Sequence, residues 1–242
     1  MNLLILTALT VGGATVFGGA MGLIFRSTTK KFTDGVLSLA AGVMLAAALV
    51  GLIMPSIEGA DVFVATIGIF LGALAVNLLD LLVPFTVKAG KYTENDRLRR
   101  VILFVMAIAF HNLPEGVAAG VGLGAGEGAD GFFIALAIAL QNLPEGLIVT
   151  VSMLGAGIRP TRAFLISALT GVIEIFGTFI GYFAVEISSY MLPLILTVAG
   201  GAMLYVINEE MIPETHSEGS GVLSTYLMLL GFSIMLIIGE LL

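Results

Sequence analysis

Two hexapeptides of closely related sequence, HNLPEG at 111–116 and QNLPEG at 141–146, lie in long apolar stretches of the chain. Each contains an imidazole or amide side chain, an asparagine and a glutamate, which offer nitrogen and oxygen donors to a cation. A charged side chain at the centre of a bilayer costs roughly 2.5–3.5 kcal/mol on insertion scales, and such residues usually mark an ion or substrate pathway. The two hexapeptides are therefore the first candidates for a functional site.

The spacing within each hexapeptide suits a helix that presents ligands to a cation. The first residue and the glutamate are four positions apart, so a helix places them on the same face, one turn from each other. Asn112 and Asn142 are rotated about 100° from the first residue, with the glutamate between the two. Glu115 and Glu145 could therefore serve two neighbouring cations, or hold one and bridge another. The proline of each hexapeptide breaks a backbone hydrogen bond and could free a carbonyl oxygen for the site.

The composition places these residues in an integral membrane protein. Of the 242 residues, 58% are hydrophobic and 11% are charged, whereas a typical soluble protein has about 25% charged residues. Apolar stretches near 20 residues long recur, and each could cross a bilayer as a helix. We predict one all-α membrane domain over 1–242, with eight transmembrane helices at about 2–25, 34–54, 62–83, 101–123, 131–154, 163–185, 190–208 and 221–242.

The charged residues predict an orientation. All ten lysine and arginine residues fall in the first, third and fifth loops, which share one side of the membrane. The positive-inside rule makes that side cytoplasmic and leaves both termini extracytoplasmic. Acidic residues, Glu58 among them, occupy the opposite loops, where they could concentrate cations or simply be easy to translocate. The absence of cysteine excludes disulfides, thiolate metal ligands and thiol redox chemistry.

The predicted helices bring three acidic side chains to one depth. At about 1.5 Å of rise per residue, His111 and Glu115 lie roughly 15–21 Å from the inner surface, and Gln141 and Glu145 lie at a matching depth from the outer surface. Glu174 lies roughly 17 Å from the inner surface on the helix at 163–185. These helices carry no deep lysine or arginine, so protons or a metal ion must neutralise the acids. His111 would suit a borderline divalent metal.

Several of these residues also have a purely structural interpretation. Polar side chains in membrane helices often only bridge helices by hydrogen bonds, which explains Asn112 or Gln141 alone better than it explains the whole set. Met44, at mid-depth in the second helix, could contact a soft cation or only pack. Glu209 and Glu210, near the inner end of the seventh helix, could receive a cation leaving the membrane or simply be solvated.

These features resemble the ZIP (Zrt/Irt-like) divalent metal transporters, in particular their prokaryotic GufA-like branch. The resemblance covers essentially the whole chain: eight spans with outward termini, HNLPEG in the fourth, QNLPEG in the fifth, GVIEIFG in the sixth and NEEMIPETH after the seventh. It implies a bundle in which helices 1–3 and 6–8 are related by an inverted repeat around helices 4 and 5.

The resemblance also implies a two-metal centre in mid-membrane. One site would use His111, Glu115, Gln141 and Glu145, with Met44 nearby. Its neighbour would use Asn112, Asn142 and Glu174, with Glu115 and Glu145 bridging the two. Glu58 would match an outer entrance, and Glu209 and Glu210 an inner exit.

The chain departs from the family pattern in two places. Many members carry a histidine or an acid where this chain has Gln141 and Asn142, so its second site has less charge. The loop at 85–100 lacks the histidine cluster that is common in the family, so sensing of cytosolic metal by this loop is not expected.

We therefore expect a multi-pass plasma-membrane transporter, not an enzyme, that moves a divalent transition metal toward the cytoplasm. Zn²⁺ is the first candidate, as substrate and bound ion, and Fe²⁺, Cd²⁺, Mn²⁺, Co²⁺ or Ni²⁺ could also pass. One alternative is an intramembrane metal-dependent hydrolase, but a catalytic zinc site typically needs three strong protein ligands. A proton-coupled carrier of an organic cation would use the acids but not the histidine and amides. Divalent metal ions and the lipid bilayer are the expected partners, a homodimer is open, and nucleic acid is not expected.

Overall fold

The computed structural model describes seven ranges of the chain: 2–25, 29–59, 61–89, 96–125, 129–187, 191–216 and 221–241. Side chains are described throughout these ranges except at 59, 79–89, 96–108, 110–111, 129–132 and 186–187. The side chain of His111 thus lies outside the described residues, although its backbone belongs to a helix.

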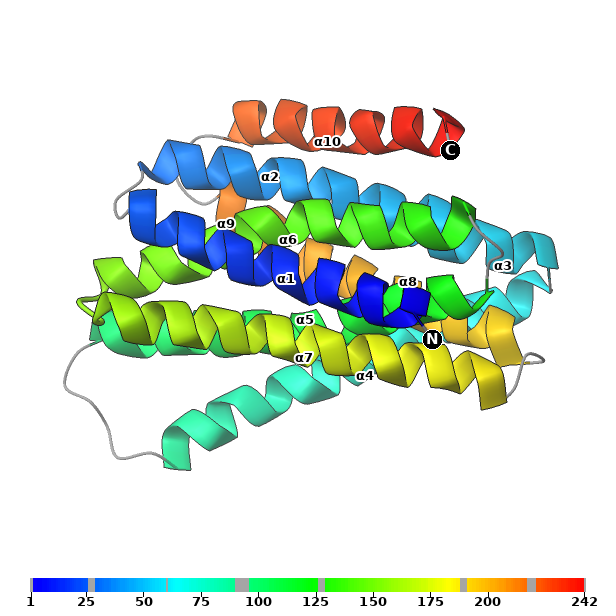
Figure 1. Ribbon diagram of the computed structural model, residues 1–242, viewed down its shortest axis with the longest axis horizontal. Coiled ribbons are helices and arrows are strands. Elements are labelled where there is room, and N and C mark those ends of the chain that lie inside the picture. Colours follow the sequence, from blue (N-terminus) through cyan, green and yellow to red (C-terminus); the bar gives the residue numbers. More distant parts are fainter. Residues whose placement is uncertain are drawn as a thin grey trace.

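All regular structure within these ranges is helical (Figure 1). The elements are α1 (Asn2–Phe25), α2 (Lys30–Ala46), η1 (Ala47–Ile53), α3 (Met54–Gly59), α4 (Val62–Ala89), α5 (Asp96–Ala125), α6 (Ala129–Gly155), α7 (Pro160–Ile187), α8 (Leu192–Val206), η3 (Ile207–Met211), α9 (Ile212–His216) and α10 (Gly221–Leu241). In the described part of the chain, six helical stretches are long and apolar enough to cross a membrane, and Val62–Leu78 is a shorter apolar helix. The all-α membrane fold is confirmed, whereas eight spans and the inverted repeat stay predictions.

Two of the long helical stretches contain a wider π-helical segment followed by a proline. In Lys30–Glu58, η1 precedes Pro55, and in Leu192–His216, η3 precedes Pro213. A proline has no backbone N–H and clashes with the carbonyl four residues earlier, and a π turn is one of the local adjustments found at such kinks. The segment NEEMIPETH therefore continues the helix that begins at Leu192 instead of following it as a loop.

Pairs of helices approach each other closely at glycines that face the partner's backbone. Between α5 and α7, Gly177 faces the backbone oxygen of Leu113, where an added Cβ would lie 2.6 Å away, and Gly116 faces the backbone oxygen of Glu174 even more tightly. The α1–α6 pair is built in the same way through Gly18 and Gly146. Small residues let membrane helices gain packing energy where no hydrophobic driving force exists between them. These contacts hold the hexapeptides of α5 and α6 against α7 and α1.

The remaining long helices form a second set of pairs, α2 with α10 and α4 with α8. In the first pair, Gly42 faces the backbone oxygen of Met228 and Gly231 faces that of Leu39. Among the candidate spans, α6 is the most enclosed. Of its most hydrophobic 18-residue stretch 72% is buried, against 17% for the corresponding stretch of α10. The core of the molecule therefore lies at α6 and its neighbours, and α10 covers α2 from outside.

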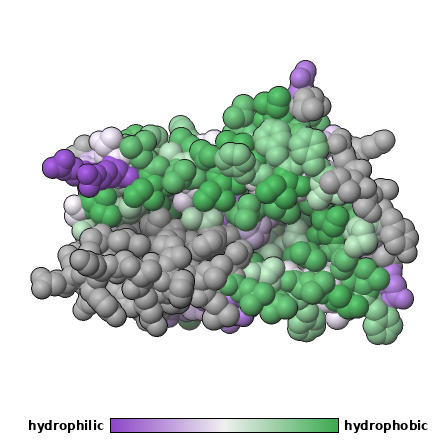
Figure 2. All heavy atoms as spheres, turned by 90° about the horizontal axis from the view of Figure 1, so that it is seen from below, coloured by the Kyte–Doolittle hydropathy of each residue, from purple (hydrophilic) through white to green (hydrophobic). Residues whose placement is uncertain are grey.

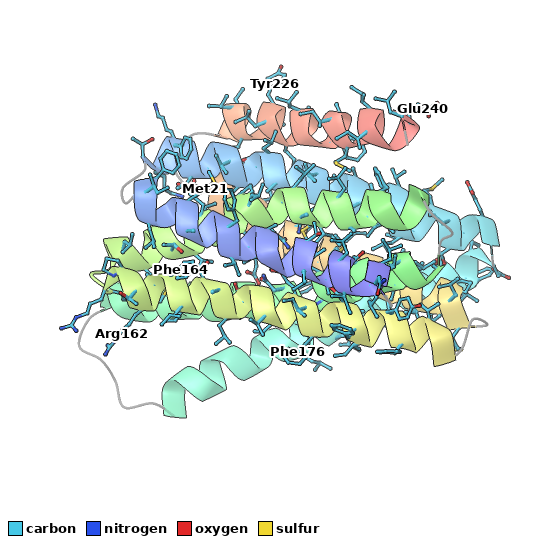
Figure 3. All side chains as sticks on the ribbon, viewed as in Figure 1. Met21, Arg162, Phe164, Phe176, Tyr226 and Glu240 are labelled. Atoms are coloured by element: carbon cyan, nitrogen blue, oxygen red, sulfur yellow. The ribbon has the colours of Figure 1, made fainter. Side chains whose placement is uncertain are left out.

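The surface and the ends of the molecule suit a membrane. Hydrophobic side chains cover most of the described surface in Figure 2, and hydrophilic ones gather towards its edges. The two termini lie at one end of the bundle in Figure 1. Arg162 projects from the opposite end in the same view (Figure 3).

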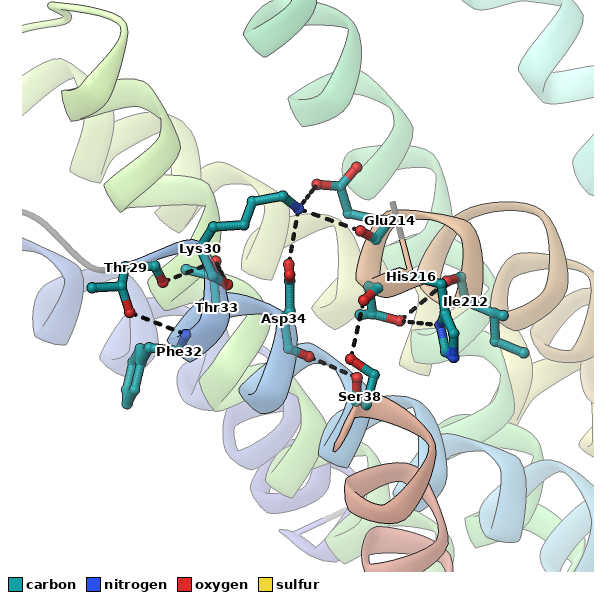
Figure 4. A network of polar contacts seen from close by, with 11 residues as sticks. Thr29, Lys30, Phe32, Thr33, Asp34, Ser38, Ile212, Glu214 and His216 are labelled. Carbon is teal, nitrogen blue, oxygen red and sulfur yellow. Dashed lines mark hydrogen bonds and ion pairs between the residues drawn. The ribbon is translucent and has the colours of Figure 1, made fainter. Parts of the chain in front are cut away.

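A polar network ties α2 to α9 near the start of α2 (Figure 4). The Lys30 ammonium donates to Oδ1 of Asp34 at 2.8 Å and to Oε1 of Glu214 at 3.2 Å. Asp34 is only 2% exposed, so the ammonium supplies a positive charge where the carboxylate has lost most of its water. His216 of α9 contacts the Thr225 hydroxyl through Nε2 at 3.2 Å, which extends the network to α10.

The close approach of α2 and α10 predicts that Gly42→Ala destabilises the protein. The added methyl group would meet the backbone of α10, which cannot move away like a flexible side chain, and overpacking of this kind costs about 1–3 kcal/mol. Thermal unfolding of the purified protein in detergent measures the effect. Gly13→Ala is the matched control, because nothing lies within 4 Å of an added Cβ there. Equal unfolding temperatures for the two variants would contradict the packing described.

Candidate metal centre

The two hexapeptides lie in the middle of α5 and α6, and both helices continue through their proline. The glycine at the end of each hexapeptide packs closely against the backbone of a neighbouring helix. Gly116 packs on the backbone of Glu174 in α7, and Gly146 packs on the backbone of Thr15 in α1. The motif therefore positions two other helices as well as supplying polar side chains.

The carboxylate of Glu174 is the centre of one buried network. Its Oε1 accepts hydrogen bonds from the Thr15 hydroxyl at 2.6 Å and from the Asn112 amide. Its Oε2 accepts a hydrogen bond from the Asn142 amide at 2.5 Å, and the same amide also donates to the backbone oxygen of Val11. Thr15, Asn112, Asn142 and Glu174 are all fully buried. Four helices, α1, α5, α6 and α7, thus meet at one carboxylate.

A second network joins α5 directly to α6. The Gln141 amide donates to Oε1 of Glu115 at 2.7 Å, and both side chains are fully buried. Glu145 is also buried, at 6% exposure. Its carboxylate interacts electrostatically with those of Glu115 and Glu174. The three acids that the sequence predicts at one depth therefore lie close enough to repel one another.

Four buried oxygen atoms of these networks have no hydrogen-bond partner among the residues that the structure describes. They belong to side chains of both hexapeptides: Asn112 Oδ1, Glu115 Oε2, Gln141 Oε1 and Asn142 Oδ1. A buried polar atom without a partner costs about 1–3 kcal/mol, and the cost rises near carboxylates that already repel. Oxygen acceptors grouped beside carboxyl groups suit a cation, which would satisfy them.

The carboxylates alone do not make such a site. Across the described residues, no group of three or more histidine, aspartate or glutamate side chains is arranged to hold a metal ion. The amide oxygens of Asn112, Gln141 and Asn142 would have to contribute, together with His111, whose side chain lies outside the description. A centre built in this way mixes charged and neutral ligands.

The other candidates from the sequence lie on α2, α3 and η3, outside the four helices that carry these networks. Met44 is fully buried in α2, which packs against α6. Glu58 is exposed in α3, and Glu209 is exposed and Glu210 half-buried in η3. In Figure 1, α3 lies towards the end that carries the termini, and α9, which follows η3, lies towards the other end. These three acids therefore lie towards the two ends of the bundle and not at its centre.

Thr15 contacts the centre, but the sequence analysis did not select it. A threonine in an apolar helix looks like an ordinary packing residue, because its hydroxyl can bond the carbonyl of its own helix. The only sequence signal is a shared pattern, GGATVFGGAMG at 12–22 and GVIEIFGTFIG at 171–181, in which Thr15 and Glu174 hold the same position.

Comparisons with known proteins identify the family. A family model described as "ZIP Zinc transporter" matches residues 89–239. Zinc transporter GufA of Myxococcus xanthus is 33% identical over 97% of this chain and 96% of its own length. This chain belongs to the ZIP family. Zinc transporter ZIPB of Bordetella bronchiseptica is 34% identical over 92% of this chain and 76% of its own length, and human Zinc transporter ZIP11 is 31% identical over 93% and 92%.

Membership settles the broad class of the protein. It is a multi-pass membrane transporter of metal ions and not an enzyme, so the intramembrane hydrolase is set aside. The expectation of a GufA-like ZIP protein is confirmed.

The hydrogen bonds of Asn142 predict that Asn142→Leu destabilises the protein. The variant removes a donor from the Glu174 carboxylate and from the Val11 carbonyl, and both acceptors stay buried. The expected loss is about 1–3 kcal/mol of unfolding free energy, measured by thermal or denaturant unfolding in detergent. In the control Asn208→Leu, the lost hydrogen bond lies within one exposed helical turn, and the change should be smaller. A smaller effect at Asn142 than at Asn208 would count against the network.

Proposed function

We propose that the whole chain forms one domain that carries divalent transition-metal ions, first of all Zn²⁺, toward the cytoplasm through a mid-membrane two-metal centre. The observation that carries this proposal is the set of buried amide and carboxylate oxygens without hydrogen-bond partners among the described residues. The similar proteins GufA, ZIPB and ZIP11 are named as zinc transporters, which supports Zn²⁺ as the substrate. Fe²⁺, Cd²⁺, Mn²⁺, Co²⁺ and Ni²⁺ accept overlapping ligand sets and would compete with it.

The hydrogen bonds divide the candidate ligands into the same two groups that the two proposed metal sites need. Gln141 pairs with Glu115, and these two residues would form the first site together with His111 and Glu145. Asn112 and Asn142 pair with Glu174 and would form the second site. Glu145 interacts electrostatically with an acid of each group, which suits a residue that bridges the two.

The amides give the centre a way to load and release its cargo. An amide carries a donor and an acceptor on one planar group, so a rotation of that group replaces an N–H bond to a carboxylate with an oxygen ligand to a metal. When the ion leaves, the reverse rotation restores the hydrogen bond, and the carboxylate is not left bare. Neutral oxygens also bind a divalent ion less tightly than carboxylates would, which favours release.

The distribution of charge along the bundle supports an orientation in the membrane. Arg162, near the start of α7, projects from the end that the positive-inside rule assigns to the cytoplasm, and the termini lie at the opposite end. Glu58 would then stand at the extracytoplasmic entrance, with Glu209 and Glu210 towards the cytoplasmic exit. The plasma membrane is the proposed location.

Alanine replacement of Glu115 or Glu145 should abolish Zn²⁺ uptake into proteoliposomes. Each variant removes a charged ligand that the proposed centre uses in both sites, while the helix itself tolerates alanine. Glu240→Ala, near the end of α10, is the control and should keep wild-type uptake. The amount of inserted protein is measured for every variant. Zn²⁺ flux near the wild-type rate in Glu145→Ala would refute the centre.

Uptake should weaken as the external pH falls from about 7.5 to about 5.5, the range in which histidine ordinarily titrates. Imidazole and carboxylate ligands must lose their protons to bind metal, so protons compete with Zn²⁺. The initial rate of uptake against Zn²⁺ concentration, at several pH values and with equal pH on both sides, measures this competition. A flat profile would show that neutral His111 does not bind the transported ion.

A further inference from the structure

Helices α1 and α7 share a register at the centre of the molecule. Their segments 12–22 and 171–181 have glycine at the first, seventh and eleventh positions and phenylalanine at the sixth. Thr15 and Glu174 both occupy the fourth position of this pattern. At this position one helix carries a neutral hydroxyl and the other carries a carboxyl group, and both side chains belong to the network around Glu174.

The packing contacts follow the same register. Gly146 of α6 faces the backbone oxygen of Thr15, and Gly116 of α5 faces the backbone oxygen of Glu174. Gly12 and Gly171 face each other's backbone oxygens. A Cβ added to Gly171 would lie 2.5 Å from the backbone oxygen of Gly12. Thr15 therefore packs against α6 in the same way that Glu174 packs against α5. The two residues hold equivalent positions on α1 and α7.

The two equivalent side chains also touch. The Thr15 hydroxyl donates to Oε1 of Glu174 at 2.6 Å. The hydroxyl is the donor in this hydrogen bond, and the carboxylate oxygen accepts it. Thr15 is fully buried, and the contacts of α1 with Gly146 and Gly171 leave its backbone little room to move. The hydroxyl is therefore a rigid donor to a carboxylate that approaches from another helix.

We propose that Thr15 is a positioning residue of the metal centre, which fixes the Glu174 carboxylate for the ion from the equivalent place on α1. This inference rests on the proposed function. The carboxylate oxygens also accept hydrogen bonds from the amides of Asn112 and Asn142, and in the loading step proposed above these amides turn toward the metal. Of these three partners, Thr15 is the one without an amide group, so it cannot turn an amide oxygen toward the metal in place of its hydrogen bond. It holds Glu174 in place while the other two bonds are exchanged.

The proposal also explains how the centre limits its charge. The shared register offers two equivalent positions, and this chain fills one with a carboxylate and the other with a hydroxyl. A second carboxylate at 15 would repel Glu174 and bind a divalent ion more tightly, which slows release. The hydroxyl keeps the geometry without the charge.

The test compares Thr15→Val with Thr15→Ser in proteoliposomes by the Zn²⁺ concentration that gives half-maximal uptake. Valine keeps the shape and removes the donor, and we expect this concentration to rise on the order of tenfold, as for loss of a hydrogen bond to a charged group. Serine keeps the donor and should restore most of the apparent affinity. Thr197→Val is the control, because Thr197 is equally buried but, within the described part of the chain, its hydroxyl bonds only carbonyls of its own helix. This control should behave as the wild type.

A second comparison separates positioning from packing. If Thr15 acts through Glu174, Thr15→Val should cause no further loss of apparent affinity in a Glu174→Gln background. The proposal is overturned if Thr15→Val matches the wild type, if serine is no better than valine, or if valine causes the same loss in both backgrounds. Thr15→Ala replaces valine if the valine variant does not insert. Absence of Zn²⁺ uptake by the wild-type chain would instead refute the proposed function, and unfolding temperatures of the wild type, Thr15→Val, Glu174→Gln and the double variant would then test the Thr15–Glu174 coupling.

Discussion

The buried polar networks exist because helix backbones come unusually close at paired glycines. Amide and carboxylate side chains are short, so Asn112 of α5 and Asn142 of α6 can reach Glu174 of α7 only if the three helices nearly touch. Gly116 and Gly177 provide that approach between α5 and α7, where any larger residue would meet backbone atoms that cannot yield. Glycine weakens an isolated helix, but between membrane helices it allows the close packing that replaces the hydrophobic effect.

This close packing surrounds a group of buried polar side chains whose hydrogen bonds are only partly satisfied among the described residues. Glu174 accepts three hydrogen bonds, whereas Glu115 accepts one from Gln141 and keeps an oxygen without a partner among the described residues. A half-satisfied network destabilises a folded protein, and the glycine contacts around it offset that cost. Under the proposed function, these acceptors are the atoms that a passing ion would use.

The sequence is informative where a residue is costly in lipid and uninformative where it is not. Long apolar stretches predict the all-α membrane fold, which is confirmed, and the depth calculation predicts one level for Glu115, Glu145 and Glu174, which are all buried in the bundle. Thr15 could not be selected, because a hydroxyl is cheap to bury and only the partner helix shows what it bonds. The η1 and η3 segments were also missed, although Pro55 and Pro213 mark both. The role of His111 stays a prediction, because its side chain lies outside the described residues.

The order of the helices along the chain has a consequence for biogenesis. The four helices that meet at Glu174 are complete once α7 has left the ribosome, whereas α2 receives its partner α10 only after α8 and α9 have also been made. Until then, the small-residue face of α2 around Gly42 is open to lipid or to a membrane chaperone. A contact between segments so distant in sequence forms slowly. The nascent transporter should therefore pass through an intermediate with an assembled centre and an uncovered flank, the stage at which membrane quality control would recognise a failed copy.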